Sequence, residues 1–163
     1  MERILISSGG YKKVKQELEN LKKERPEIIQ SIKDAREEGD LSENAGYDAA
    51  RERQGLLEAR ITHIESRMGV FEVIDLNTME GTKVAFGAIV ELENIETEEK
   101  KTYTILGPDE ADFEKGSISI LSPVARAILG KEAGDEAIVD APGGKIEYEI
   151  LSVQFLGKQA DSL

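Results

Sequence analysis

Two acidic side chains, Asp40 and Glu43, have the types and spacing that could take part in chemistry. They stand three positions apart in the segment 39–44, Gly-Asp-Leu-Ser-Glu-Asn. Mg²⁺ accepts carboxylate oxygens, but it keeps several waters and usually shares its site with phosphates. Two carboxylates are therefore too few to hold the ion alone, and they would complete a site whose other ligands belong to a partner. The same spacing also resembles a helix capping box, with Asp40 as the cap and Glu43 reaching back to it. Both interpretations stay open here.

A repeated apolar pattern on either side of this segment predicts the elements that carry the two acids. In residues 11–35, and again in 47–71, mainly apolar residues recur at alternating steps of three and four, the spacing of one helix face. The two series are mirror images about residue 41. Two long helices folded back on each other have this symmetry, with the acidic segment as the turn between them. Ser7 or Ser8 is expected to cap the first helix.

Charged residues beside the apolar positions support the antiparallel hairpin. In such a hairpin, e positions should face e positions, and g positions should face g positions. Four facing pairs are then opposite in sign: Lys15 with Glu65, Lys22 with Glu58, Glu17 with Arg67, and Glu24 with Arg60. Each exposed pair is worth only about 0.2–1 kcal/mol, but together they favour one register and one orientation.

Toward the turn the charge pairing stops. Arg36 has no partner across the turn, and Arg51 faces Ile29. Both arginines lie at e positions, so they share one edge of the hairpin. They are either solvated surface residues or a basic strip left unneutralised so that it can touch an anion.

The pattern changes after Asp75, where apolar and polar residues begin to alternate with period two. Two β-hairpins are predicted, over 88–106 and 137–155, with a short strand at 117–121 and a short helix that ends before Gly130. The predicted fold class is α+β: an antiparallel coiled-coil hairpin over residues 1–77, followed by a small antiparallel sheet domain with one helix over 78–163. No phosphate loop, catalytic triad or metal-spaced His/Cys set occurs in this second half.

Composition narrows the range of partners. The formal net charge is −12, and residues 76–163 hold 8 Lys/Arg against 17 Asp/Glu, a net charge of −9. Because phosphate affinity comes mainly from Lys and Arg, independent DNA binding is not expected, whereas a basic protein partner is easier to support. The chain has no cysteine, no apolar run of about 18 residues and no signal-peptide pattern. A cytoplasmic monomer with no membrane association is expected.

Several motifs together carry a family resemblance. They are Arg25-Pro26, the segment Ala-Arg-Glu-Glu-Gly-Asp-Leu-Ser-Glu-Asn-Ala at 35–45, Tyr-x-Ala-Ala-Arg-Glu at 47–52, and Ser-Pro-x-x-Arg-Ala-x-Leu-Gly-Lys at 122–131. On these residues the chain resembles, over nearly its whole length, the bacterial transcript cleavage factors of the Gre family.

The resemblance implies a factor that acts on backtracked bacterial RNA polymerase and is not itself an enzyme. The second half would have an FKBP-like fold and dock at the rim of the polymerase secondary channel, with Ser122, Pro123 and Arg126 near the docking surface. The hairpin would enter the channel, where Asp40 and Glu43 would help to hold a second Mg²⁺ for RNA hydrolysis. The basic residues Arg36 and Arg51 would contact the 3′ segment of the nascent RNA.

One residue departs from the family pattern, and three other functions compete with this one. Gly46 stands where the family usually has Glu, which puts in doubt the strength of metal recruitment but not the two principal acids.

Within the family, some members inhibit polymerase without cleavage, but the extra aspartates of those inhibitors are absent. An FKBP-like prolyl isomerase or chaperone would need an apolar, aromatic-lined pocket, for which this half has few aromatic residues. A purely structural coiled-coil adaptor would leave the acidic turn unexplained.

Overall fold

The computed structural model describes residues 2–38 and 45–157. The chain divides into two compact units. The first unit is Lys12–Phe71, and the second combines Glu2–Tyr11 with the described residues from Glu72 onward. The sequence pattern places the N-terminal residues with the hairpin, but in the structure Glu2–Tyr11 pack with the sheet unit.

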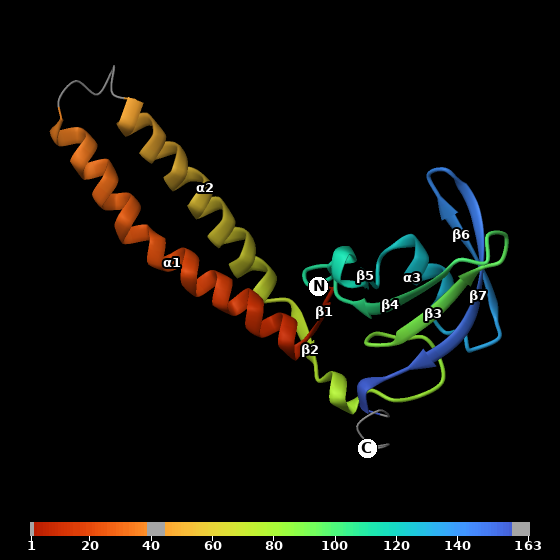
Figure 1. Cartoon of the computed structure of the whole chain (residues 1–163). Helices are drawn as coiled ribbons and strands as arrows, with labels where there is room; N and C mark the ends of the chain where they lie inside the picture. The colour runs from red at the N-terminus through yellow and green to blue at the C-terminus, as the bar shows by residue number, and fades with distance from the viewer. Residues whose placement is uncertain (1, 39–44, 158–163) are drawn as a thin grey trace. The chain divides into compact units, whose positions relative to one another are not determined.

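Two long helices make up the first unit (Figure 1). Helix α1 spans Ser8–Glu37 and continues through Pro26, and helix α2 spans Ala45–Met68. They lie side by side and run in opposite directions, as the mirrored apolar pattern predicts. Asp40 and Glu43 fall between them in the chain, outside the described residues.

Apolar residues of the mirrored pattern form the seam between the two helices. Burial of these side chains from water is the main force that holds the helices together. The central cluster draws buried residues from both helices: Ile28, Ile32, Ala50, Leu57 and Ile61, with Leu18, Leu21 and Tyr47 packed around them. The prediction of a helical hairpin is confirmed.

A two-stranded sheet near the N-terminus was not visible in the sequence pattern. Strand β1 covers Ile4–Ser7 and pairs with strand β2, which covers Phe71–Ile74. The apolar periodicity counts Phe71 as the last seam position of the second helix, but α2 ends at Met68 and Phe71 lies in β2. Phe71 is buried all the same, so the periodicity identified its burial correctly and its conformation wrongly.

Hydrogen bonds between Ser7 and Glu110 connect β1 with the rest of the sheet unit. The Ser7 hydroxyl accepts a hydrogen bond from the Gly10 amide at 3.0 Å, so Ser7 caps α1 as predicted. The same hydroxyl donates to Glu110 Oε1. Glu110 Oε2 accepts from the Ser7 amide at 2.8 Å and from the Gly107 amide at 3.0 Å. One carboxylate therefore joins β1 to the loop that follows strand β4 (Lys100–Leu106).

The second unit is built on a five-stranded sheet with the order β5-β4-β3-β7-β6. The strands are β3 Ile89–Asn94, β4 Lys100–Leu106, β5 Ser117–Ser119, β6 Glu136–Ala141 and β7 Gly144–Gln154. Neighbouring strands are antiparallel except β4 and β5, which are parallel. Both predicted β-hairpins are present, β3 with β4 and β6 with β7. A short helix, α3 (Pro123–Ile128), and two 3₁₀ turns, η1 (Leu76–Thr78) and η2 (Phe113–Lys115), complete the unit.

Alternating side chains of the sheet and one face of α3 form the core of this unit. Val90 and Leu92 on β3 are fully buried, and Ala125 and Ile128 of α3 belong to the same cluster. A β-bulge between Glu91 and Leu92 shifts the register of β3 against β7; such bulges bend and twist a sheet. Figure 1 shows the sheet curled accordingly. In the described part of the chain, no helix is both long and apolar enough to cross a bilayer.

Candidate functional site

Arg36 and Arg51 come together on one face of the helical hairpin. Arg36 lies in the last turn of α1, and Arg51 lies near the start of α2. Both side chains line the same surface hollow, which has a volume of about 250 Å³. The predicted shared edge is therefore present, and its residues surround a concave surface.

The Arg36 guanidinium lies over the ring of Tyr47, with its carbon 5.9 Å from the ring centroid. A cation at this distance is attracted to the aromatic face, and the contact is worth about 0.5–1 kcal/mol at an exposed site. Within residues 2–38 and 45–157, neither Arg36 nor Arg51 forms an ion pair with a carboxylate. The two positive charges are thus available to an anion from outside this described part.

Of the residues that the structure describes, four more line this hollow that the sequence did not indicate as site residues: Ile29, Ile32, Lys33 and Gln54. A signal for two of them exists in the sequence. Lys33 precedes Arg36 by three positions, and Gln54 follows Arg51 by three, so each shares a helix face with its arginine. Gln54 appears in the sequence only as an interruption of the apolar seam.

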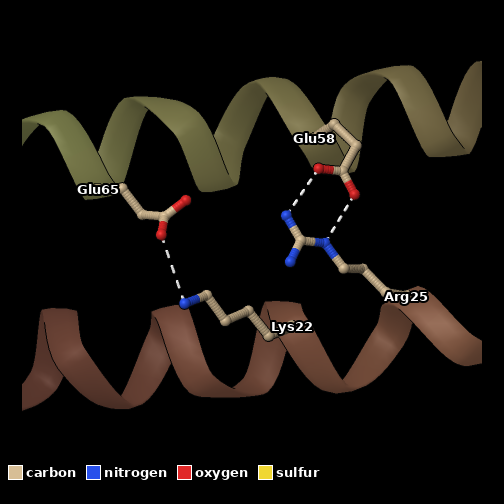
Figure 2. A network of polar contacts seen from close by, with 4 residues as sticks. All are labelled: Lys22, Arg25, Glu58 and Glu65. Carbon is tan, nitrogen blue, oxygen red and sulfur yellow. Dashed lines mark hydrogen bonds and ion pairs between the residues drawn. The ribbon is translucent and has the colours of Figure 1, made fainter.

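A set of ion pairs joins the two helices across the seam (Figure 2). Arg25, which interrupts the seam on α1, donates from Nε to Glu58 Oε1 at 2.7 Å and from Nη2 to Glu58 Oε2 at 2.8 Å. Lys22 Nζ lies 3.4 Å from Glu65 Oε2. On the other edge, Arg60 donates from Nε and Nη2 to Glu17 Oε1.

These contacts correct the heptad prediction, which places Lys22 opposite Glu58 and Arg60 opposite Glu24. The opposite signs are right, but the partners differ. A guanidinium can hold a carboxylate with two parallel hydrogen bonds, which an ammonium cannot. Arg25 therefore takes Glu58, and Lys22 reaches Glu65 instead.

The Arg25–Glu58 pair is expected to make hairpin stability depend on pH. Hydrogen bonding to Arg25 lowers the pKa of Glu58 below its ordinary value of 4.5. Because the folded-state pKa is lowered, the stabilisation is present above the unfolded pKa and is lost as pH falls through the folded one. The substitution Glu58→Gln should therefore lower the urea midpoint at pH 7, and the deficit should shrink as the pH is taken well below 4.5. Glu65→Gln, which loses a single contact at 3.4 Å, is the control and should cause a smaller change. A deficit for Glu58→Gln that stays constant across this pH range would contradict the assignment.

Ser122 caps helix α3 of the sheet unit, and Pro123 and Arg126 lie on that helix. The Ser122 hydroxyl accepts from the Ala125 amide at 3.3 Å and caps the helix, and Pro123 occupies its first turn. Proline suits this position because its missing N–H would have no helical partner. Pro123 and Arg126 are exposed, as are the flanking residues Leu121 and Leu129. Ser122 thus sets the geometry of the helix, and the other side chains form its surface.

Asp40 and Glu43, the predicted metal ligands, lie outside the described residues. In residues 2–38 and 45–157, no group of three or more His, Cys, Asp or Glu side chains is arranged to hold a metal ion. The donor chemistry of the two acids is nonetheless that of an Mg²⁺ ligand, since the ion prefers carboxylate oxygens.

Both units match known protein families. Residues 4–73 match the model of the N-terminal part of transcription elongation factors, and residues 79–155 match the model of the C-terminal part of transcription elongation factors GreA and GreB. The chain therefore belongs to the GreA/GreB family of transcription elongation factors.

Several curated relatives carry the name of one member of this family. The chain is 68% identical over 157 residues to transcription elongation factor GreA of Nitratidesulfovibrio vulgaris, covering 96% of each chain. It is 64% identical over 159 residues to the GreA of Desulfovibrio desulfuricans, covering 98% of each. Among solved structures it is similar to the GreA factor homolog 1 (Gfh1) protein of Thermus thermophilus, with 25% identity and a TM-score of 0.44, covering 94% of this chain and 99% of that one.

Proposed function

We propose that this protein binds bacterial RNA polymerase that has backtracked and stimulates cleavage of the 3′ end of the nascent RNA at the polymerase's own active centre. Family membership supports the proposal. The observation that carries it is the hollow on the hairpin, where Arg36 and Arg51 lie near the helix ends that the acidic segment joins. A helical hairpin with cations near the helix ends that the acidic segment joins is suited to reach a nucleic acid inside a larger complex.

Asp40 and Glu43 have the role of completing a Mg²⁺ site whose other ligands are supplied by polymerase. Mg²⁺ held at such a site would lower the pKa of a bound water and neutralise charge on the leaving oxygen. The two carboxylates of this chain would help to hold that ion and orient the attacking water, while Arg36 and Arg51 would hold the RNA backbone. The protein is an accessory factor in this scheme, because the bond is broken in the polymerase.

The surface of α3 has the role of docking the sheet unit at the rim of the secondary channel. Pro123 and Arg126 are exposed there, and Leu121 and Leu129 extend the surface with apolar side chains that are 55% and 38% exposed. Apolar anchors beside an arginine are typical of protein interfaces. We place this function in the cytoplasm, with the protein acting as a monomer and without binding DNA by itself, in keeping with its charge of −12.

A cleavage assay tests the proposed function. The protein is added to stalled, backtracked elongation complexes with Mg²⁺, and the length of the RNA is followed over time. Short 3′ fragments should be released faster than without the protein, and free RNA without polymerase should stay intact. Slower RNA extension with no added cleavage would instead indicate a polymerase inhibitor of the same fold.

Arg51→Ala is expected to reduce cleavage more than it reduces docking. A hydrogen bond to a charged group is worth about 1.5–3 kcal/mol, which corresponds to a loss of about tenfold or more in the cleavage rate. The affinity for polymerase, measured in a binding titration, should change little. Arg53→Ala is the matched control, since Arg53 is exposed on the same helix but does not line the hollow. If Arg51→Ala weakened docking and left cleavage of the bound complex unchanged, the RNA contact would be wrong.

A further inference from the structure

The hollow on the hairpin has an apolar part and a positively charged part, and neither a small inorganic anion nor a purely apolar ligand would use both. Its apolar part is Ile29 and Ile32, and its polar part is Lys33, Arg36, Arg51 and Gln54. Ile32 belongs to the buried seam, whereas Ile29 is 57% exposed. Among the residues that the structure describes, 2–38 and 45–157, no acidic residue lines the hollow, although the chain as a whole carries a net charge of −12.

The lining excludes the simplest ligands. A phosphate or sulfate ion would be satisfied by the three cations, but it would gain nothing from the exposed face of Ile29. A purely apolar ligand would desolvate Lys33, Arg36 and Arg51 without giving them partners, which costs free energy. Charge complementarity therefore requires an anion that also carries an apolar surface.

A nucleotide of single-stranded RNA has both parts. Its phosphate is anionic, its base has an apolar face, and the base edge carries hydrogen-bond donors and acceptors. A volume of about 250 Å³ lies below the range of about 300–1,000 Å³ typical of drug-sized ligands, so the hollow suits one base and not a base pair. In duplex RNA the bases are stacked and paired, and their faces are not available.

We propose that this hollow seats one unstacked base of the extruded RNA, with the base face on Ile29 and Ile32. Lys33, Arg36 and Arg51 hold the adjoining phosphates, and the Gln54 amide meets the base edge. The inference rests on the proposed function and goes beyond it, because it makes the hairpin a reader of the base as well as of the backbone. The ring of Tyr47, 5.9 Å from the Arg36 guanidinium carbon, favours a position of Arg36 beside the hollow.

The test combines a change in the protein with a change in the RNA. Backtracked complexes are made with normal RNA and with RNA that carries one abasic nucleotide, placed in turn at each extruded position. For each complex, cleavage with the factor is divided by cleavage without it, so that effects on the polymerase alone cancel. The protein is used as the unmodified full chain, as Ile29→Ser, and as Leu56→Ser.

The expected result is a coupling between Ile29 and one base position. On normal RNA, Ile29→Ser should lower the stimulation about fivefold or more, the scale of losing a base contact of about 1–3 kcal/mol. With the abasic nucleotide at that position, the unmodified protein should fall to the same level, and Ile29→Ser should cause no further loss. Leu56→Ser, at a residue 68% exposed on the other helix and outside the hollow, should leave stimulation unchanged on both RNAs.

Three outcomes would overturn the inference. The first is an equal loss for Ile29→Ser on normal and abasic RNA at every position, since the base would then not be what Ile29 contacts. The second is the same loss for Leu56→Ser, which would indicate a general effect of polar substitution on the hairpin. The third is the absence of any stimulation by the unmodified protein on normal RNA. This result would overturn the proposed function as well, whereas the first two outcomes overturn only the contact with the base. Because Ile29 is exposed, Ile29→Ser should fold, and its helix content is checked by circular dichroism.

Discussion

Asp40→Asn and Glu43→Gln are each expected to abolish stimulated RNA cleavage while leaving the affinity for polymerase unchanged. Metal-assisted stabilisation of the developing charge is worth several kcal/mol, so the loss should be about 100-fold or more in rate. Both substitutions keep the size of the side chain and remove its charge, which is what a Mg²⁺ ligand needs. The measurement is the rate of 3′ fragment release from backtracked complexes at saturating protein, with binding followed in parallel.

The same variants decide between metal recruitment and helix capping. Asn is as good a helix cap as Asp, so Asp40→Asn should leave helix content and the unfolding midpoint nearly unchanged. Asp48→Asn is the matched control, because Asp48 is an exposed acid in the first turn of α2, and it should retain cleavage. If Asp40→Asn and Glu43→Gln stimulated cleavage as well as the unmodified protein, the two acids would serve only as helix caps. Raising the Mg²⁺ concentration should partly restore a variant that has only weakened the metal site.

Gly107→Ala is expected to give the largest loss of stability among single-methyl additions to the sheet unit. A Cβ at this position would overlap the carbonyl oxygen of Leu5 and approach its carbonyl carbon to 3.0 Å. Both atoms belong to the backbone of β1, which cannot move aside without breaking its pairing with β2 or the Ser7 contacts to Glu110. Overpacking of this kind costs about 3 kcal/mol. Urea unfolding measures the loss, and amide exchange in residues 4–7 should accelerate with it.

Gly55→Ala is the matched control for that prediction, because it makes the same chemical change in open space. Gly55 lies inside α2, and a Cβ there would meet no heavy atom within 4 Å apart from its chain neighbours and the adjoining backbone of its own helix. Alanine favours a helix interior over glycine by about 1 kcal/mol, so this variant should be more stable than the unmodified protein. Destabilisation by both variants would point to a general sensitivity to substitution, and a stable Gly107→Ala would mean that β1 does not approach Gly107 closely.

The helical hairpin was predictable because its signal is local and repeated. The spacing of three and four along 11–35 and 47–71 indicates which face of each helix is apolar. The mirror symmetry of the two series about residue 41 predicts that these two faces pack against each other. The hairpins β3–β4 and β6–β7 were predictable for a similar reason, since their strands follow each other closely in the chain. The short pairing of β1 with β2 was not, because strands of four residues far apart in sequence leave too few alternating positions to recognise.

The partners in the ion pairs of the hairpin could not be predicted from the sequence pattern. The heptad positions state which edges carry opposite charges, and these signs are right. They do not state that Arg25, a seam residue, reaches Glu58 with two hydrogen bonds and so leaves Lys22 to Glu65. The choice depends on side-chain length and on donor geometry across the helix pair.

The sequence by itself therefore determined the hairpin, the edge shared by Arg36 and Arg51, and the family to which the chain belongs. Only the tertiary structure decided that this edge is a hollow, that Lys33 and Gln54 line it, and that the exposed Ile29 lies beside the arginines. The physical reason is that periodicity along one helix fixes which way a side chain points, whereas the shape of a surface depends on how two helices pack and which volumes their side chains leave unfilled.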